Sequence, residues 1–294
     1  MKKGEILIFG AGSVGSYLAA KLALSGHNIN VIGRKAEKIG SYLYINDEKF
    51  HFPTTSTNIN SQIKYNYIFL TCKIYDLKNN LQHLKRWSPK SEIIILLQNC
   101  FFDITEFKNT YPQELTSILV FDGFNLTGNR LKHTKGAGFL LENTKYSERL
   151  TQLLKDSNIE TRTTDNMLQH RAEKTIYNCA INIFSAIYSK TVRELFANSS
   201  TLERMKNVFY ESYEVLSQEI DIPQDKESLW NHLIQFAGTL NHYASTYQDV
   251  RENKVTEIAF LNGFIIDLGR KVGVATPYNI EAVKIFKKKY PNFY

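Results

Sequence analysis

The sequence has few cysteines and no long apolar segment. Its three cysteines stand apart from one another, so they predict neither a disulfide framework nor a zinc site, and we expect no bound metal. The longest apolar run, Ile93 to Leu97, has the length of a buried strand, whereas a membrane helix needs roughly 18 apolar residues. A secretory signal is also missing, because Glu5 and the glycines from Gly10 onward interrupt any apolar stretch near the start. Together these features favour a protein of the reducing cytoplasm with no membrane partner.

The sequence also lacks a concentrated block of charge. Lysine and arginine number 36 against 29 acidic residues, a formal net charge of +7, but the basic residues are scattered. The densest run, Lys284 to Lys289, closes a predicted helix, where cations interact favourably with the helix dipole. Basic and aromatic residues form no common patch, so no nucleic-acid partner is predicted. With 43% hydrophobic residues the chain can bury a sizeable core, which excludes disorder along its whole length.

Predicted strands and helices alternate along the first half of the chain. Short apolar runs predict strands at Glu5–Phe9, Asn28–Ile32, Tyr65–Leu70, Glu92–Leu97 and Ser117–Phe121. Helical spacing predicts helices at Ser13–Ser25, Tyr75–Leu84 and Phe102–Asn109. This alternation is typical of parallel βαβ units and predicts an α/β fold with a Rossmann-like, doubly wound sheet. We also expect a hairpin within Leu43–Phe52 that turns at Asn46 and Asp47, and antiparallel edge strands within Leu126–Glu142.

Long helical patterns replace the strands after about Asp165. They predict helices at Met167–Ser189, Leu202–Ile220, Glu227–Leu240, Thr256–Val272 and Tyr278–Lys289. We therefore divide the chain into a Rossmann-like dinucleotide-binding domain, residues 1–165, and an all-helical substrate domain, residues 166–294. The helices are more apolar than one small core requires, which is compatible with a homodimer formed through this half.

A glycine-rich turn stands directly between the first predicted strand and the first predicted helix. Its residues are Gly10, Ala11, Gly12, Ser13, Val14 and Gly15. In a dinucleotide-binding turn, the first glycine permits the tight turn, the second lets the backbone approach a pyrophosphate, and the third allows close packing of helix and strand. The position of the motif favours a dinucleotide site over a purely structural turn.

The end of the second predicted strand indicates which dinucleotide is bound. NAD-binding folds usually place an acid there to bind the ribose 2′-hydroxyl, but this strand is followed by Gly33, Arg34 and Lys35. A carboxylate at this position would repel a 2′-phosphate, whereas Arg34 can bind the phosphate through two parallel hydrogen bonds. We therefore favour NADP(H) over NAD; the alternative is a solvated loop with ordinary surface charges.

The helical half carries a polar stripe at a spacing of four residues. Lys174, Asn178 and Asn182 fall on one face of a helix that is otherwise apolar nearly all round. Buried polar side chains need partners, so the asparagines either satisfy neighbouring loops or grip a polar ligand beside the lysine. Further along, Glu257 stands at the start of the predicted helix Thr256–Val272, with Thr256 as its expected N-cap. For Glu257 alone, stabilisation by the helix dipole is a sufficient explanation.

These residues, in this order, resemble the ketopantoate reductases (2-dehydropantoate 2-reductases) over essentially the whole chain. The resemblance rests on the following motifs: the Gly10–Gly15 turn, Arg34, Thr71-Cys72-Lys73, Gln98-Asn99, Lys174-x3-Asn178-x3-Asn182, Ser245-x2-Gln248-Asp249-x-Arg251, Thr256-Glu257-Ile258, Asn262-Gly263, and Gly273-Val274-x-Thr276-Pro277-x-Asn279. It implies a Rossmann domain joined to a helical domain. It also implies NADPH-dependent reduction of 2-dehydropantoate to (R)-pantoate in the synthesis of pantothenate and coenzyme A.

The resemblance also implies roles for individual residues. Lys174 is then the general acid that protonates the substrate oxygen as hydride reaches C2, and Glu257 binds the substrate hydroxyl. The residues that hold the carboxylate and hydroxyl groups are then Asn178, Asn182 and Ser245. Asn99 is expected near the nicotinamide and Lys174, and Lys73 and Glu257 near the cofactor. An ammonium donor suits this chemistry, because hydride addition to a ketone builds negative charge on oxygen.

Three positions depart from the family pattern. Cys100 stands where the family usually has glycine, and a side chain there is expected to force another turn geometry or to crowd the nicotinamide side. Ala259 replaces a common acid, and Ala275 a common proline. These departures keep two alternatives open: the same chemistry on another 2-oxo acid, or a catalytically silent NADPH-binding sensor.

Overall fold

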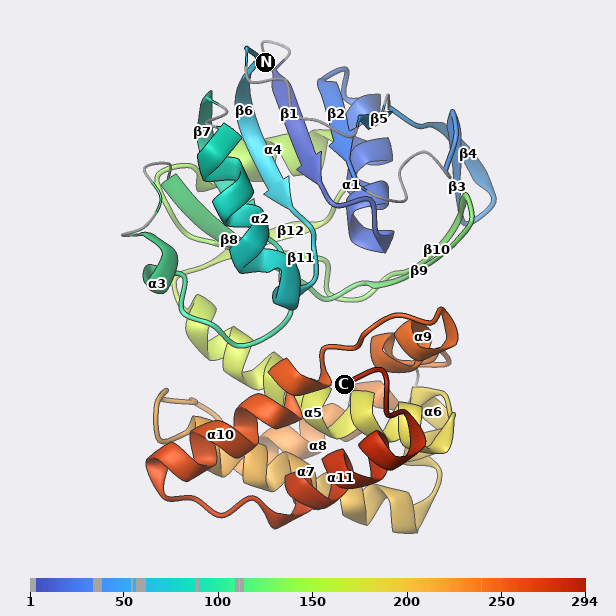
Figure 1. Ribbon diagram of the computed structural model, residues 1–294, viewed down its shortest axis with the longest axis vertical. Helices are drawn as coiled ribbons and strands as arrows, with labels where there is room; N and C mark the ends of the chain where they lie inside the picture. The colour runs from blue at the N-terminus through green and yellow to red at the C-terminus, as the bar shows by residue number, and fades with distance from the viewer. Residues whose placement is uncertain are drawn as a thin grey trace. The chain divides into compact units, whose positions relative to one another are not determined.

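The computed structural model describes residues 4–33, 39–53, 55–56, 62–87, 90–108, 111, 114–238 and 240–294 (Figure 1). The chain forms two compact units. An N-terminal unit comprises Met1–Asn99 and Asp103–Met167, and a helical unit comprises Leu168–Tyr294 together with the short segment Cys100–Phe102.

The N-terminal unit is built on an eight-stranded sheet of order β12-β11-β8-β7-β6-β1-β2-β5. Its strands are β1 (Glu5–Phe9), β2 (Asn28–Ile32), β5 (Thr55–Ser56), β6 (Lys64–Leu70), β7 (Lys90–Leu96), β8 (Glu114–Val120), β11 (Phe139–Glu142) and β12 (Thr161–Thr164). The six strands from β5 to β8 in this order are parallel, whereas β11 pairs antiparallel with β8. The chain runs outward from β1 in both directions, as in the predicted doubly wound sheet.

The helices of this unit are α1 (Ser13–Leu24), α2 (Ile74–Trp87), α3 (Thr105–Lys108) and α4 (Ser147–Asp156). Figure 1 shows α2 in front of the sheet and α4 behind it. The predicted helix Phe102–Asn109 is wrong in extent among the described residues. The side chain of Asp103 accepts a hydrogen bond from the Thr105 N–H at 2.8 Å, which starts the helix at Thr105, and Asn109 lies outside the described residues.

A second, four-stranded sheet of order β4-β3-β10-β9 packs against α1. Its strands are β3 (Tyr42–Ile45), β4 (Glu48–His51), β9 (Gly123–Thr127) and β10 (Arg130–Thr134). The predicted hairpin turn is confirmed, because Asn46 and Asp47 have φ angles of 48° and 70°, as a two-residue turn between twisted strands requires. Apolar side chains of both sheets, α1 and α4 share one core.

The helical unit contains α5 (Met167–Tyr188), which starts at the unit boundary, α6 (Val192–Phe196), α7 (Ser199–Leu216), α8 (Lys226–Ala237), α9 (Ser245–Arg251), the 3-10 turn η2 (Ile258–Phe260), α10 (Asn262–Val272) and α11 (Pro277–Lys289). The single helix predicted over Thr256–Val272 is therefore wrong. Leu261, with φ −106° and ψ −95°, separates η2 from α10. None of the described helices combines the length and the apolar character needed to cross a membrane.

A buried carboxylate joins three helices of this unit. Glu211 of α7 is 6% exposed and accepts hydrogen bonds from the Tyr278 and Asn279 N–H groups in the first turn of α11, both at 2.8 Å. The Asn279 side chain donates to Glu211 and accepts from Asn262 of α10, each at 2.9 Å. Burial raises the pKa of Glu211, and the hydrogen bonds oppose that rise only in part.

Glu211→Ala is expected to lower the free energy of unfolding by about 3 kcal/mol, because it removes the acceptor of three hydrogen bonds, two of which are buried. Glu211→Gln keeps one acceptor oxygen and should cost less. Glu214→Ala, one turn along α7 in an exposed ion pair with Lys226, is the control and should cost at most about 1 kcal/mol. Urea unfolding measures all three variants; equal losses for Glu211→Ala and Glu214→Ala would contradict this role of Glu211.

Candidate functional site

The glycine-rich turn connects β1 to α1 at the carboxyl end of the parallel strands. Gly10 has a φ angle of +125°, a backbone conformation that side chains disfavour. A side chain at Gly15 would collide with the Gly10 carbonyl oxygen and with the Thr71 hydroxyl, so glycine is required for this close approach. Gly12, the N-cap of α1, faces open space, and no side chain caps the helix. An uncapped helix start with open space before it can accept a phosphate.

Two polar side chains link the ends of neighbouring strands at this edge of the sheet. The Thr71 hydroxyl, just after β6, donates to the Gly10 carbonyl at 2.7 Å. The Gln98 amide, just after β7, donates to the carbonyls of Leu70 and Cys72, both at 3.0 Å. Lys73 lies directly before α2, and Asn99 follows Gln98. Both predicted site residues therefore lie at the same edge of the sheet as the glycine-rich turn. Arg34 and Lys35, on which the choice of dinucleotide depends, lie outside the described residues.

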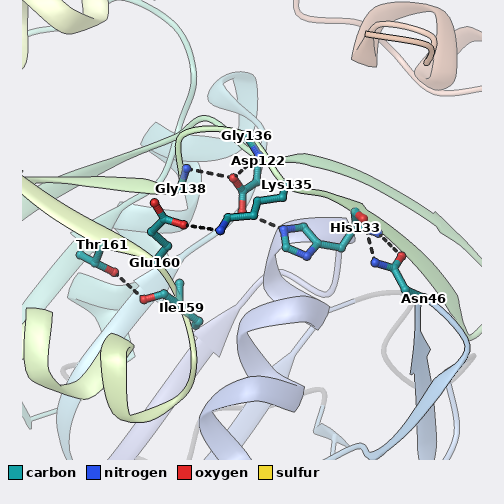
Figure 2. Close-up of polar contacts among 9 residues, drawn as sticks. All are labelled: Asn46, Asp122, His133, Lys135, Gly136, Gly138, Ile159, Glu160 and Thr161. Carbon is teal, nitrogen blue, oxygen red and sulfur yellow. Dashed lines mark hydrogen bonds and ion pairs between the residues drawn. The ribbon is translucent and has the colours of Figure 1, made fainter. Parts of the chain in front are cut away.

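A partly buried polar cluster holds the small sheet against α1. Asp122, two residues after β8, accepts hydrogen bonds from the Gly136 and Gly138 N–H groups at 2.8 and 2.9 Å and pairs with His133 at 2.7 Å (Figure 2). The His133 ring packs on Tyr17 of α1, with ring centroids 4.8 Å apart. Burial alone would raise the pKa of Asp122, but these hydrogen bonds outweigh burial and hold the pKa below its ordinary value. Burial, with the charge of Asp122 nearby, raises the pKa of Tyr17 to about 12.

Helix α5 carries the predicted polar stripe of the helical unit. Lys174 and Asn178 are partly buried and Asn182 is 6% exposed, while apolar neighbours such as Ile176 and Ile183 are fully buried. The four-residue spacing keeps the three polar side chains on one face of the helix. The stripe thus lies on a mostly buried helix, where each polar group needs a hydrogen-bond partner.

The structure brings two of the predicted site residues into contact. The Asn182 amide donates to the hydroxyl of Ser245, the first residue of α9, at 3.4 Å. Ser245 itself is exposed, so its hydroxyl is accessible beside the polar stripe. A side-chain amide and a hydroxyl arranged in this way can bind a carboxylate or hydroxyl group of a small molecule.

Glu257 is placed differently from the prediction. It is the N-cap residue of the 3-10 turn η2, and Thr256 does not cap a helix there, because the Thr256 hydroxyl donates to the Phe293 carbonyl at 2.7 Å. The segment is still tied to α5. The fully buried Asn262, at the start of α10, donates to the Cys179 carbonyl at 3.0 Å, one residue after Asn178.

The segment that contains Cys100 packs on the helical unit. Arg171, one turn before Lys174 on α5 and 1% exposed, donates to the Cys100 carbonyl at 3.1 Å. Its guanidinium lies 4.0 Å from the centre of the Phe102 ring, a cation–π contact. Among the described residues with positive φ angles Cys100 does not appear, so its side chain requires no strained turn.

Sequence reasoning missed the supporting residues Arg171, Asp122 and His133. The signal for Arg171 was a cation one turn from Lys174 within an apolar helix. The signal for Asp122 was an acid at the end of a strand, followed by closely spaced glycines at Gly136 and Gly138. His133 offered no signal, since its pairing with Asp122 depends on the register of β9 and β10.

Asp122→Asn is expected to lower the free energy of unfolding by about 1–3 kcal/mol at pH 7, because an amide cannot replace all three interactions of the carboxylate. Because folding lowers the pKa of Asp122 from 3.8, its stabilisation is present above pH 3.8 and is lost as the pH falls through the lowered pKa. Urea unfolding at several pH values should therefore show a smaller acid loss for the variant. Asp47→Asn, which alters an exposed pair with Arg130, is the control; identical acid losses in Asp122→Asn and the wild type would refute the prediction.

Comparisons with known proteins identify the family of this chain. Residues 6–144 match the family model described as "Ketopantoate reductase PanE/ApbA", and residues 166–289 match "Ketopantoate reductase PanE/ApbA C terminal". A 2-dehydropantoate 2-reductase of Aquifex aeolicus is 25% identical over 310 residues, covering 97% of this chain and 96% of the relative.

Two solved structures share the fold, each with a TM-score of 0.84 and 23% sequence identity. One is a PanE/ApbA family ketopantoate reductase from Ralstonia eutropha JMP134, matched over 97% of this chain and 99% of that protein. The other is a D-mandelate dehydrogenase with NADH and anilino(oxo)acetate, matched over 98% and 99%. The two family matches cover most of both units, and the chain therefore belongs to the ketopantoate reductase PanE/ApbA family of oxidoreductases.

Proposed function

We propose that this protein reduces 2-dehydropantoate to (R)-pantoate with NADPH, in the pathway to pantothenate and coenzyme A. The observation that carries the proposal is the polar face of α5, where Lys174 shares a nearly buried helix with Asn182, whose amide reaches Ser245. Membership of the PanE/ApbA family supports the reaction class, and the Aquifex aeolicus relative supports the substrate.

Lys174 is the general acid in this proposal. Bound NADPH supplies the hydride that adds to C2 of the substrate. The Lys174 ammonium stabilises the negative charge that develops on the carbonyl oxygen and donates a proton to it.

The remaining polar residues orient the substrate. Asn178, Asn182 and Ser245 hold its carboxylate and hydroxyl groups, and Glu257 accepts a hydrogen bond from a substrate hydroxyl. In the N-terminal unit, Asn99 binds near the nicotinamide of the cofactor. Fixing the substrate in this way lowers the barrier, because the reacting atoms are already aligned when hydride transfer begins.

The cofactor is held by the N-terminal unit. The unpaired N–H groups at the start of α1 bind the pyrophosphate, and the open space before Gly12 and the uncapped helix start fit such a group. Lys73 adds a positive charge at the same edge of the sheet. Arg34 binds the 2′-phosphate and so selects NADPH over NADH.

A second candidate is the same hydride chemistry on another 2-oxo acid. The fold shared with a D-mandelate dehydrogenase favours this alternative, because that protein carries anilino(oxo)acetate rather than a branched aliphatic acid. Cys100 and Ala259, where this chain departs from the family pattern, are consistent with a changed substrate.

We also propose that the protein forms a homodimer in the cytoplasm. The exposed side chains of Ile234, Phe236 and Ile280, on α8 and α11, offer apolar surface for the dimer.

Lys174→Ala is expected to lower kcat by about 10²–10⁴-fold, the usual contribution of a general acid. Its Kd for NADPH should stay close to that of the wild type, because the dinucleotide site lies on the other unit. NADPH oxidation at 340 nm with 2-dehydropantoate and a panel of 2-oxo acids gives kcat, and fluorescence titration gives Kd. Lys271→Ala, at an exposed lysine of α10, is the control; unchanged turnover in Lys174→Ala would remove Lys174 from the mechanism.

Arg34→Ala is expected to weaken NADPH binding by about 10–100-fold while changing NADH binding little, since a charge-assisted bidentate contact is lost with the 2′-phosphate alone. The matched control is Arg162→Ala, at an exposed arginine of β12 on the far edge of the sheet. Parallel titrations with both dinucleotides measure the effect. Equal weakening of NADPH and NADH would contradict the assignment of the 2′-phosphate to Arg34.

A further inference from the structure

We propose that Ser185 is a positioning residue that sets where the Ser245 hydroxyl stands relative to Asn182. The inference deepens the proposed function and rests on it, because it concerns substrate binding at the same polar face of α5. Ser185 itself is fully buried and so contacts no substrate.

The Ser185 hydroxyl joins three segments of the helical unit. It donates to the Lys190 carbonyl, in the turn after α5, at 2.7 Å. It also accepts a hydrogen bond from the Ala244 N–H at 3.2 Å, in a buried contact 59 residues away along the chain. One hydroxyl on α5 therefore fixes the position of the residue that immediately precedes Ser245.

Ala244 is the N-cap of α9, and its side chain offers no capping group. A helix start without a side-chain cap depends on its surroundings for placement. The contact with Ser185 supplies that placement, because Ser245 is the first residue of α9 and is joined to Ala244 by one peptide bond. The hydroxyl that faces Asn182 is thus positioned from α5 itself.

The contact that depends on this anchor is a long one. Asn182 and Ser245 are 3.4 Å apart, near the outer limit for a hydrogen bond, so a shift of a few tenths of an ångström breaks it. Asn182 and Ser185 are three residues apart and lie on the same side of α5. The two side chains hold successive residues, Ser245 and Ala244, at adjacent points of one helix face.

The neighbouring backbone keeps this effect local. The Val192 N–H donates to the His242 carbonyl at 2.9 Å, and the Arg193 N–H donates to the Leu240 carbonyl at 3.0 Å. These bonds hold the segment before α9 beside α6 without any help from Ser185. Removing the Ser185 hydroxyl should therefore displace the start of α9 and leave the helical unit folded.

Ser185→Ala is expected to raise KM for the 2-oxo acid by about three- to tenfold, as for one lost hydrogen bond, with kcat and the Kd for NADPH changed far less. Ser185→Thr keeps a hydroxyl and should restore KM. Ser212→Ala is the matched control, since it removes a fully buried helix hydroxyl that bonds within α7 to the Val208 carbonyl. Hydrogen exchange at the Ala244 amide should quicken only in Ser185→Ala, which gives a readout independent of activity.

Ala244→Pro removes the same hydrogen bond from its other end. The Ala244 φ angle of −64° already suits proline, so the change deletes the N–H without forcing a new backbone conformation. It should raise KM as Ser185→Ala does, and the double variant should add little to either. Additive effects of the two substitutions would show that they act separately and would overturn the proposal.

The substrate for these assays is the 2-oxo acid that the wild type turns over best in the panel described above. Ser245→Ala distinguishes the two levels of inference. If it raises KM while Ser185→Ala and Ala244→Pro do not, the substrate role of Ser245 stands and the positioning role of Ser185 is wrong. If Ser245→Ala leaves KM unchanged, both the substrate role and the positioning role are wrong.

Discussion

The buried helix α5 imposes the constraint on which the helical unit depends, because polar groups inside a dry helix bundle must find partners. Several polar groups of α5 meet that requirement by holding other elements: Asn182 reaches α9, and Ser185 reaches the residue before α9. The Cys179 carbonyl receives Asn262 at the start of α10, and Arg171 holds the Cys100 carbonyl. These contacts with α5 position the segments that follow Glu257 and precede Ser245. The hydrogen bonds that pair the buried polar groups of α5 therefore also shape the proposed site.

In the N-terminal unit, the corresponding constraint is the close approach of the α1 backbone to the end of β1. Gly15 brings α1 so near the end of β1 that a side chain would strike the Gly10 carbonyl, and Thr71 hydrogen bonds to that same carbonyl. The first turn of α1 is thereby held at the carboxyl edge of the sheet with its N–H groups outward. The Asp122–His133 pair supports the same helix from the small sheet through Tyr17. These contacts fix the backbone of the turn at which we propose that the dinucleotide binds.

The strands at Glu5–Phe9 and Asn28–Ile32 were predicted with their observed bounds, because short apolar runs between glycines or polar residues leave little choice of state. The prediction of one helix over Thr256–Val272 was wrong, because the helical spacing of apolar residues continues through a point at which the helical backbone is interrupted. Thr256 hydrogen bonds to the Phe293 carbonyl, and Asn262 hydrogen bonds to α5. The helix is interrupted at Leu261, which allows both contacts to form. The pairing of Asp122 with His133 was likewise beyond the sequence, since it depends on strand register.

The sequence by itself determined the order of elements, the glycine-rich turn and the polar stripe of α5, because each arises from local spacing along the chain. The sequence also identified the family, through motifs spread over both units. Only the tertiary structure decided which distant side chains meet. That Asn182 faces Ser245, that Ser185 holds Ala244 and that Glu211 caps α11 depend on how helices pack. Packing is settled by the need to bury apolar surface while leaving no buried polar group alone, a requirement that no short stretch of sequence expresses.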